Sequence, residues 1–107
     1  MTTQFKKGII ELCVLKIIND KEMYGFEVME TLTNELKVNE NTIYPLLRRL
    51  TGQGLFETYQ KETVNGAPRK YYKITEKGKK FLLKNLNEWQ VFLKEVNNVL
   101  EGEKNYE

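Results

Sequence analysis

The sequence predicts a mainly α-helical α+β fold that contains one small β-hairpin and ends in a long helix. Three observations predict it. Residues 41–53 place apolar side chains at helical spacing, residues 55–75 hold two segments of β-forming residues around an Asn-Gly turn, and residues 76–107 begin with apolar side chains at every third or fourth position. We therefore expect one compact unit over residues 1–75, followed by a helix and a charged tail over residues 76–107.

The composition is typical of a single globular domain. A chain of 107 residues with 40% hydrophobic residues can build one small core. No apolar run approaches the roughly 20 residues that span a membrane, and the first residues lack the apolar region of a signal peptide. Cys13 has no second cysteine to pair with and lies in an apolar run, so we expect it to be a small buried hydrophobe in a reducing cytoplasm.

Several classes of chemistry are excluded by the residues that are missing. The chain has no histidine, so it lacks a histidine-based triad, an imidazole proton shuttle and a histidine-ligated zinc site. A single cysteine rules out a cysteine-rich metal site within one chain, and no glycine-rich nucleotide-binding motif is present. The carboxylates are scattered singly along the chain. We therefore expect no enzyme activity, no metal and no cofactor.

The first two helices are expected at residues 4–19 and from Tyr24 or Gly25 to Leu36. The first is apolar around almost its whole circumference, so we expect it to be buried on several sides, one of them against a second subunit. The second has an apolar stripe that faces a core, formed by Phe26, Met29, Leu32 and Leu36.

A third helix is expected at residues 41–53, after a short link. Its apolar face consists of Ile43, Leu46, Leu47 and Leu50, and its opposite face of Asn41, Tyr44, Arg48 and Arg49. Two short helices joined by a tight turn, the second with a basic outer face, are typical of a helix-turn-helix.

The ends of this third helix carry capping residues. Asn39 or Asn41 is expected to cap its start, and Gly52 and Gly54 end it, one of them in the left-handed conformation. Pro45 removes one helical hydrogen bond and is tolerated best near a helix start. It therefore favours a helix that begins late and exposes its first turn.

Residues 55–63 and 69–75 are expected to form the two strands of a hairpin, or wing, over about residues 55–75. Asn65 and Gly66 supply the turn between them. Arg69 and Lys70 follow the turn directly, which favours phosphate contacts, whereas for Lys73 a solvated strand face and a phosphate contact remain equally open. Helix 41–53 and this hairpin together predict a winged helix-turn-helix.

The positive charge is concentrated in the middle of the chain. Residues 37–80 hold ten Lys and Arg against four Asp and Glu, a net charge of +6, whereas each flank has a net charge of −2. All three arginines, Arg48, Arg49 and Arg69, lie on the expected recognition helix or wing. Arginine binds guanine edges and phosphates through a planar fork, so this distribution indicates nucleic-acid binding.

The last helix is expected to begin after Thr75, its N-cap. A seam of apolar residues then continues for nearly three heptads, which is more than a small domain can cover by itself. We expect this seam to pack partly on the first helix and partly on a second subunit. Its members are Leu82, Leu86, Trp89, Leu93, Val96 and Leu100.

At this point the chain resembles the PadR family of bacterial transcription regulators, in particular the short members with one C-terminal helix. The matching segments are KGIIEL at residues 7–12, MYGFE at 23–27, NTIYPLLRRL at 41–50, GL at 54–55 and RKYYKITEKG at 69–78. They extend over nearly the whole chain, and TIYPLLRRL is the most specific of them.

The resemblance implies a winged-helix homodimer that binds a palindromic DNA operator, usually as a repressor, in the bacterial cytoplasm at the nucleoid. It also implies that a phenolic acid or a flat hydrophobic drug releases the DNA in some members. In small members such a ligand lies at the dimer interface against a tryptophan, which by position is Trp89. The effector site would then consist of Phe5, Ile9, Leu12, Trp89, Phe92 and Leu93. The alternative is that Trp89 fills the interface as core.

The DNA-binding hypothesis places helix 41–53 in the major groove and the wing on the backbone or in the flanking minor groove. The expected contacts are Asn41, Thr42, Tyr44, Arg48, Arg49, Lys61, Asn65, Gly66, Arg69 and Lys70, with further phosphate contacts from Lys6 and Lys7. Two other interpretations remain. One is a winged-helix module for protein–protein interaction, and the other is a ligand-sequestering dimer that binds no operator.

Overall fold

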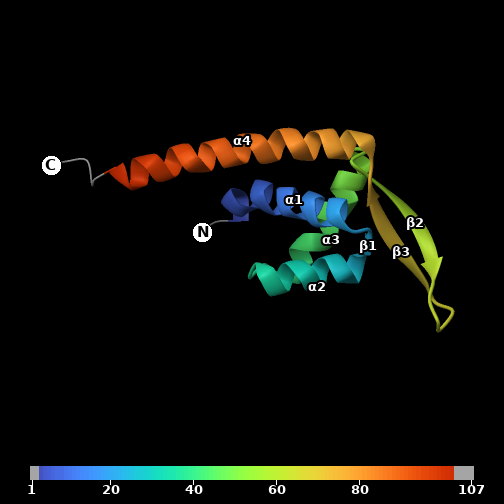
Figure 1. The fold of residues 1–107 in the computed structure, drawn as a ribbon. Coiled ribbons are helices and arrows are strands. Elements are labelled where there is room, and N and C mark those ends of the chain that lie inside the picture. Colours follow the sequence, from blue (N-terminus) through green and yellow to red (C-terminus); the bar gives the residue numbers. More distant parts are fainter. Residues whose placement is uncertain (1–2, 103–107) are drawn as a thin grey trace.

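Four helices and three short strands make up the fold, which confirms the expected α+β class. The computed structural model describes the backbone of residues 3–102 and the side chains of residues 7–102. The elements follow the order α1 (Thr3–Asp20), β1 (Met23–Tyr24), α2 (Gly25–Glu35), α3 (Glu40–Gly52), β2 (Phe56–Glu62), β3 (Pro68–Ile74) and α4 (Glu76–Leu100) (Figure 1). No helix of the described chain is long and apolar enough to cross a membrane.

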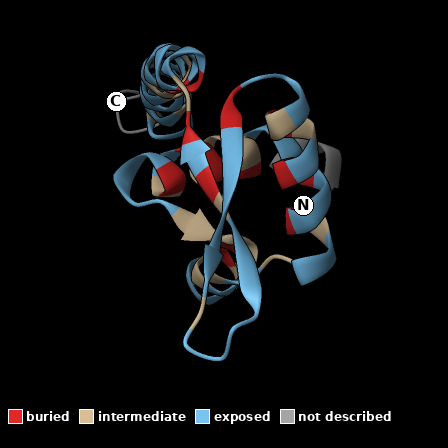
Figure 2. Ribbon diagram, turned by 90° about the vertical axis from the view of Figure 1, so that its right-hand side faces the viewer, coloured by how far each residue is buried: buried red, intermediate tan, exposed pale blue. Residues whose placement is uncertain are grey.

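The core lies where α1, α2, α3 and the base of the sheet meet. Figure 2 shows that buried residues gather on the inner sides of the helices and at the base of the hairpin, while the outer part of the hairpin is exposed. The buried apolar residues are Ile10, Val14, Leu15, Ile18, Val28, Leu32, Ile43, Leu46, Leu47, Leu50, Leu55, Phe56, Tyr72, Ile74 and Leu82. Cys13 is half-buried against this cluster, and burial raises the pKa of its thiol.

The sheet is antiparallel in the order β1-β3-β2. The hairpin matches expectation, and Gly66 at its tip has a φ of +81°, which glycine adopts without strain. Strand β1 is an addition that the sequence did not predict. Met23 pairs with Tyr72 and Tyr24 with Tyr71, so the residues just before α2 form a third strand. Two residues are too few for an alternating pattern, so only the tertiary pairing shows this strand.

Helix α3 begins earlier than Pro45 suggested. Asn39 is the N-cap, and its side chain accepts a hydrogen bond from the Asn41 amide at 2.8 Å. The helix starts at Glu40, and Pro45 lies in its second turn. The expectation of a late start was therefore wrong. Pro45 removes only the hydrogen bond to the carbonyl of exposed Asn41, where water is available, and the buried apolar face of α3 offsets that loss.

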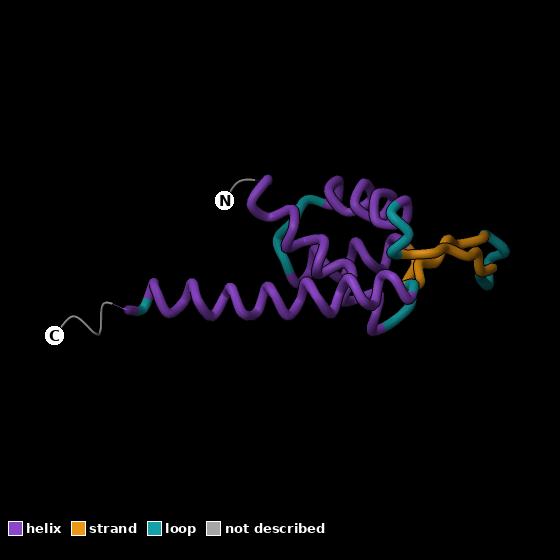
Figure 3. Tube along the Cα trace, turned by 90° about the horizontal axis from the view of Figure 1, so that it is seen from above, coloured by secondary structure: helices purple, strands orange, loops and turns teal. Residues whose placement is uncertain are grey.

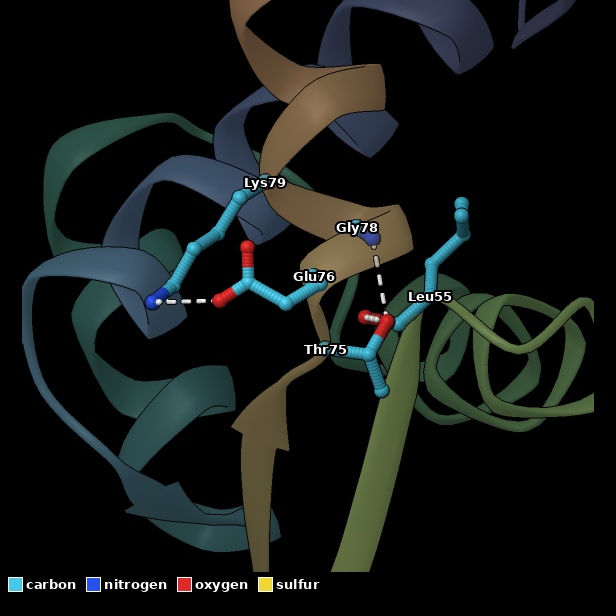
Figure 4. Close-up of polar contacts among 5 residues, drawn as sticks. All are labelled: Leu55, Thr75, Glu76, Gly78 and Lys79. Atoms are coloured by element: carbon cyan, nitrogen blue, oxygen red, sulfur yellow. Dashed lines mark hydrogen bonds and ion pairs between the residues drawn. The ribbon is translucent and has the colours of Figure 1, made fainter.

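The junction between β3 and α4 is built on Thr75 (Figure 4). Its side-chain oxygen accepts a hydrogen bond from the Gly78 amide at 3.0 Å, which confirms Thr75 as the N-cap. The Thr75 amide donates to the Leu55 carbonyl at 3.0 Å, and the Thr75 hydroxyl donates to the Gly54 carbonyl at 2.7 Å. These bonds attach the start of α4 to the turn after α3, in which Gly54 has a φ of +80°.

The second half of α4 extends beyond the body of the domain (Figure 3). Its first turns pack on the core through buried Gly78 and Leu82. Farther along the helix Leu86, Trp89 and Val96 are half-buried, whereas Leu93 is 40% exposed and Leu100 is 68% exposed. The described chain therefore covers only the beginning of the expected apolar seam.

Candidate nucleic-acid interface

Helix α3 packs its apolar face into the core and turns a polar face outward. Ile43, Leu46, Leu47 and Leu50 are all buried, as expected. Asn41, Pro45 and Arg48 follow one another along the opposite, exposed side. This side carries no apolar side chain apart from Pro45, so it is free to meet a polar surface.

Tyr44 and Arg48 lie on the edge of α3 that faces the sheet. A Cβ atom added to Gly25 would lie 3.1 Å from the Tyr44 ring and 3.9 Å from the Tyr72 ring, so both rings cover the start of α2. Burial raises the pKa of the Tyr72 hydroxyl, while the nearby positive charge of Arg48 opposes that rise. Arg48, Tyr44 and the inner face of β3 are therefore neighbours.

Arg49 takes a different position from Arg48. Its guanidinium forms an ion pair with Glu11 of α1, and both side chains are largely enclosed. Thr42 is also half-buried and lies on the same edge of α3. The two adjacent arginines of the recognition helix are thus separated: one is exposed beside the sheet, and the other is held against α1.

The wing has two faces with different cations, because successive strand residues point to opposite sides. Lys70 is two residues before Tyr72 and shares its face, the one on the side of Tyr44 and Arg48. Arg69 and Lys61 are directly paired across the two strands and point to the other side. The expected wing cations therefore do not form a single patch.

A row of three tyrosines crosses the sheet on the Arg69 side. Tyr24, Tyr71 and Tyr59 are neighbours in register on β1, β3 and β2, with ring centroids 5.6 Å and 5.5 Å apart. The Arg69 guanidinium lies 4.5 Å from the centre of the Tyr24 ring, and the Lys61 ammonium lies 5.5 Å from that of Tyr71. Cation–π attraction thus holds both cations beside the rings.

Tyr59 also joins the wing to the turn after α1. Its hydroxyl donates a hydrogen bond to the Glu22 carboxylate at 2.6 Å. That bond, with partial desolvation and the charge of Glu22, raises the pKa of Tyr59 from 10.0 to about 12.

This pKa shift predicts a pH dependence. Because the folded state holds the Tyr59 proton more tightly than the unfolded chain, the bond contributes its full stability below pH 10.0 and loses it as the pH rises through about 12. Subtracting the tyrosinate absorbance titration of Tyr59→Phe from that of the wild type should reveal one tyrosine that ionises near pH 12. Ionisation at the ordinary pKa of tyrosine would show that the bond does not persist in solution.

A basic hollow lies on the other edge of α3. It has a volume of about 570 Å³ and is bordered by three cations, Lys7, Lys37 and Arg49, with Asn39 and Thr42 beside them. Lys37 was not among the expected contacts. Its position in the link directly before the recognition helix is the sequence signal that could have identified it.

The remaining expected contacts lie at the tip of the wing and at the start of α1. Asn65 and Gly66 are exposed, and the Gly66 amide donates to the Thr63 carbonyl at 2.9 Å, which closes the turn. Lys73 is also exposed on β3. The side chain of Lys6 lies outside the described residues.

A second hollow lies between α1 and α4, and we call it the α1–α4 groove. It has a volume of about 480 Å³. Its lining consists of Gly8, Ile9, Glu11, Leu12, Phe81, Asn85, Glu88, Trp89 and Phe92. Four of the six residues expected around an effector are therefore brought together. Leu93 is not part of this lining, and the side chain of Phe5 lies outside the described residues.

Comparison with known proteins decides the family. The model of the transcriptional regulator PadR-like family matches residues 14–84. This chain belongs to the PadR-like family of transcriptional regulators. The match extends from the middle of α1 to the start of α4, so it includes the whole helix-turn-helix and the wing. At the level of the family, the function of this chain is therefore DNA binding for transcription regulation. The family consists of regulators and is not a class of enzymes.

Solved structures of transcriptional regulators have the same fold. A PadR-like transcriptional regulator from Bacillus cereus is 39% identical, with a TM-score of 0.83 over 92% of this chain and 97% of that one. A Streptococcus transcriptional regulator is 30% identical, with a TM-score of 0.84 over 92% and 98%. Among curated proteins, the transcriptional regulator Rv3488 of Mycobacterium tuberculosis is 28% identical over 87% of each chain.

Three residues that position the cations of the interface were not among the expected contacts: Tyr24, Tyr71 and Glu11. Tyr24 and Tyr71 are recognised only once β1 is seen to pair with β3. The pairing of Glu11 with Arg49 joins residues 38 positions apart, which no local pattern predicts.

Proposed function

We propose that this protein is a homodimeric repressor that binds a palindromic operator and releases it when a small aromatic effector occupies the α1–α4 groove. The observation that carries the DNA-binding part is that exposed Arg48 and Tyr44 of α3 lie near Tyr72, and that exposed Lys70 of the wing is on the same face of β3 as Tyr72. These residues join a recognition helix and a wing on one side of the molecule, which is the arrangement that docks into adjacent grooves of a duplex.

The proposed contacts divide into three groups. Asn41, Tyr44 and Arg48 reach base edges from the outer face of α3, where arginine favours guanine and asparagine favours adenine. Lys7 and Lys37 border the basic hollow, where a backbone phosphate is attracted, and Glu11 holds Arg49 at the edge of the same hollow. The wing adds a third group: Lys61, Asn65, Gly66, Arg69 and Lys70. Thr42, between the first two groups, reaches either a base or a phosphate.

Fluorescence anisotropy tests the operator proposal. Labelled duplexes of the gene's own promoter and of a scrambled sequence are titrated with protein at two salt concentrations. We expect tighter binding to the promoter and a steep fall of affinity with salt, because each neutralised phosphate contributes about 0.9 to the slope of log K against log salt. Equal, weak binding to both duplexes would contradict an operator and favour a protein–protein interaction module.

The dimer proposal rests on the uncovered part of α4. Val91, Phe92, Leu93, Val99 and Leu100 are exposed large apolar residues on its second half. Clusters of this kind on a small protein are typical of interfaces. Since two copies of α4 would cover each other's seam, the second subunit is the partner that we propose.

The change Leu93→Glu should separate the subunits. Burying an uncompensated carboxylate in the interface costs at least about 3 kcal/mol, so sedimentation should show a monomer with weaker operator binding. The matched control is Leu83→Glu, because Leu83 is also an exposed leucine of α4 but lies off the seam. A monomeric Leu83→Glu or a dimeric Leu93→Glu would place the interface elsewhere.

The effector part of the proposal rests on the α1–α4 groove. Trp89 and Phe92 of α4 face Ile9 and Leu12 of α1 across a space large enough for a small planar molecule. Because Trp89 is the only tryptophan of the chain, its fluorescence reports directly on occupancy. A ligand-sequestering dimer would show such binding without any operator affinity.

A further inference from the structure

Glu11 connects the α1–α4 groove to the edge of the DNA-binding surface. It is one of the residues that line the groove. Its carboxylate also forms the ion pair with Arg49, which in turn borders the basic hollow beside α3. One side chain of α1 therefore lies between the groove and the recognition helix.

This ion pair is more enclosed than the others that the described residues form. Only 24% of the Glu11 side chain and 34% of the Arg49 side chain are exposed. In the pair of Lys16 with Asp20, the exposed fractions are 49% and 54%. Exposed pairs contribute little to stability, whereas removing one partner of an enclosed pair leaves the other charge unpaired in a poorly solvated place. The Glu11–Arg49 pair is thus a firm attachment of α3 to α1.

The chemistry of the groove indicates the charge of its ligand. Phe81, Trp89 and Phe92 contribute three aromatic rings. The charged residues of the described lining are Glu11 and Glu88, both carboxylates. Aromatic faces and carboxylates both attract cations, and both disfavour an anion such as a phenolic acid. The ligand class that fits is a planar aromatic cation.

We propose that Glu11 couples the groove to the recognition helix: a planar aromatic cation bound in the groove takes the Glu11 carboxylate from Arg49, and α3 loses its attachment to α1. This inference rests on the proposed function. It specifies the ligand class, and it names the residue pair through which ligand binding lowers the affinity for DNA. Arg49 acts here as a positioning residue, and Arg48 remains the exposed contact on α3.

The first experiment tests the ligand class with a matched pair of probes. N-Methylquinolinium and 2-naphthoate have fused rings of similar size and opposite charge. We expect N-methylquinolinium to quench Trp89 fluorescence at a concentration at least about tenfold below that needed for 2-naphthoate. Equal affinities, or quenching only by the anion, would overturn the assignment of a cation.

The second experiment tests the coupling with operator anisotropy in the presence and absence of N-methylquinolinium, with the probe's own binding to free DNA subtracted. Wild-type operator affinity should fall by roughly 5–150-fold, the usual range of such couplings. For Glu11→Gln we expect an affinity already reduced without the probe and unchanged by its addition. Arg49→Gln should behave in the same way, and the double variant should be no weaker than either single one, because both changes break the same pair.

The controls separate this inference from the proposed function. Glu30→Gln removes an exposed carboxylate of α2 and should retain the wild-type response. Far-UV circular dichroism and urea unfolding establish that each variant is folded. A wild type that fails to prefer its operator contradicts the proposed function. A wild type that prefers its operator, together with a folded Glu11→Gln variant that still responds to the probe, overturns the coupling alone.

Discussion

Gly78→Ala should destabilise the fold by about 3 kcal/mol or more, the upper range for forcing extra volume into a packed site. A Cβ atom at this position would lie 2.2 Å from the Leu55 carbonyl oxygen and 2.6 Å from Cγ1 of Ile74. The oxygen cannot move away freely, because it accepts a hydrogen bond from the Thr75 amide at 3.0 Å. Figure 4 shows the Thr75 side chain close against the same oxygen. Urea unfolding followed by circular dichroism measures the change.

Gly52→Ala is the matched control. Gly52 is also a helical glycine, but an added Cβ would meet nothing within 4 Å. Alanine at a compatible helical position leaves stability unchanged or raises it by up to about 1 kcal/mol. If Gly78→Ala were as stable as Gly52→Ala, the close contact between α4 and the turn after α3 would not exist in solution.

Arg48→Ala should reduce operator affinity by about 1–3 kcal/mol, which is roughly 5–150-fold. Arg48 is exposed on the outer face of α3 and lies beside Tyr44 and the inner face of β3. Titration at several salt concentrations distinguishes its role. A phosphate contact would lower the salt slope by about 0.9, whereas a guanine contact would reduce the preference for the operator over scrambled DNA.

Lys84→Ala serves as the control for lost charge, since Lys84 is an exposed cation on α4, away from α3 and the wing. Its operator affinity should match that of the wild type. Sedimentation of both variants should show the wild-type assembly, because neither side chain belongs to the proposed seam. Equal affinities of Arg48→Ala and the wild type would remove Arg48 from the interface.

The parts of the fold that the sequence predicts are those with a local signal. The apolar periodicity of residues 41–53 located α3, the Asn-Gly turn located the hairpin, and Thr75 located the start of α4. In each case a few neighbouring residues carry the information, because helical spacing, turn geometry and capping are local properties. The core face of α3 could be predicted residue by residue for the same reason.

The parts that escaped prediction depend on contacts between distant segments. Strand β1 exists because Tyr24 meets Tyr71 on β3, 47 residues later. Helix α3 starts ahead of Pro45 because the burial of its apolar face outweighs the one backbone hydrogen bond that Pro45 removes. The candidate interface shows the same division: the exposed position of Arg48 followed from periodicity, whereas the pairing of Arg49 with Glu11 required the packing of α1 against α3.

The pairing of β1 with β3 makes the wing continuous with the helix-turn-helix, since Tyr24 both pairs in the sheet and occupies the N-cap position of α2. A two-stranded hairpin alone is marginally stable and would swing, but a third strand that continues into α2 and the bond from Tyr59 to Glu22 fix its direction. The spacing between wing and recognition helix is then set by the protein, so the duplex has to conform to it. Operators that contain the same contacted bases but differ in groove width or flexibility between them should therefore bind with different affinities.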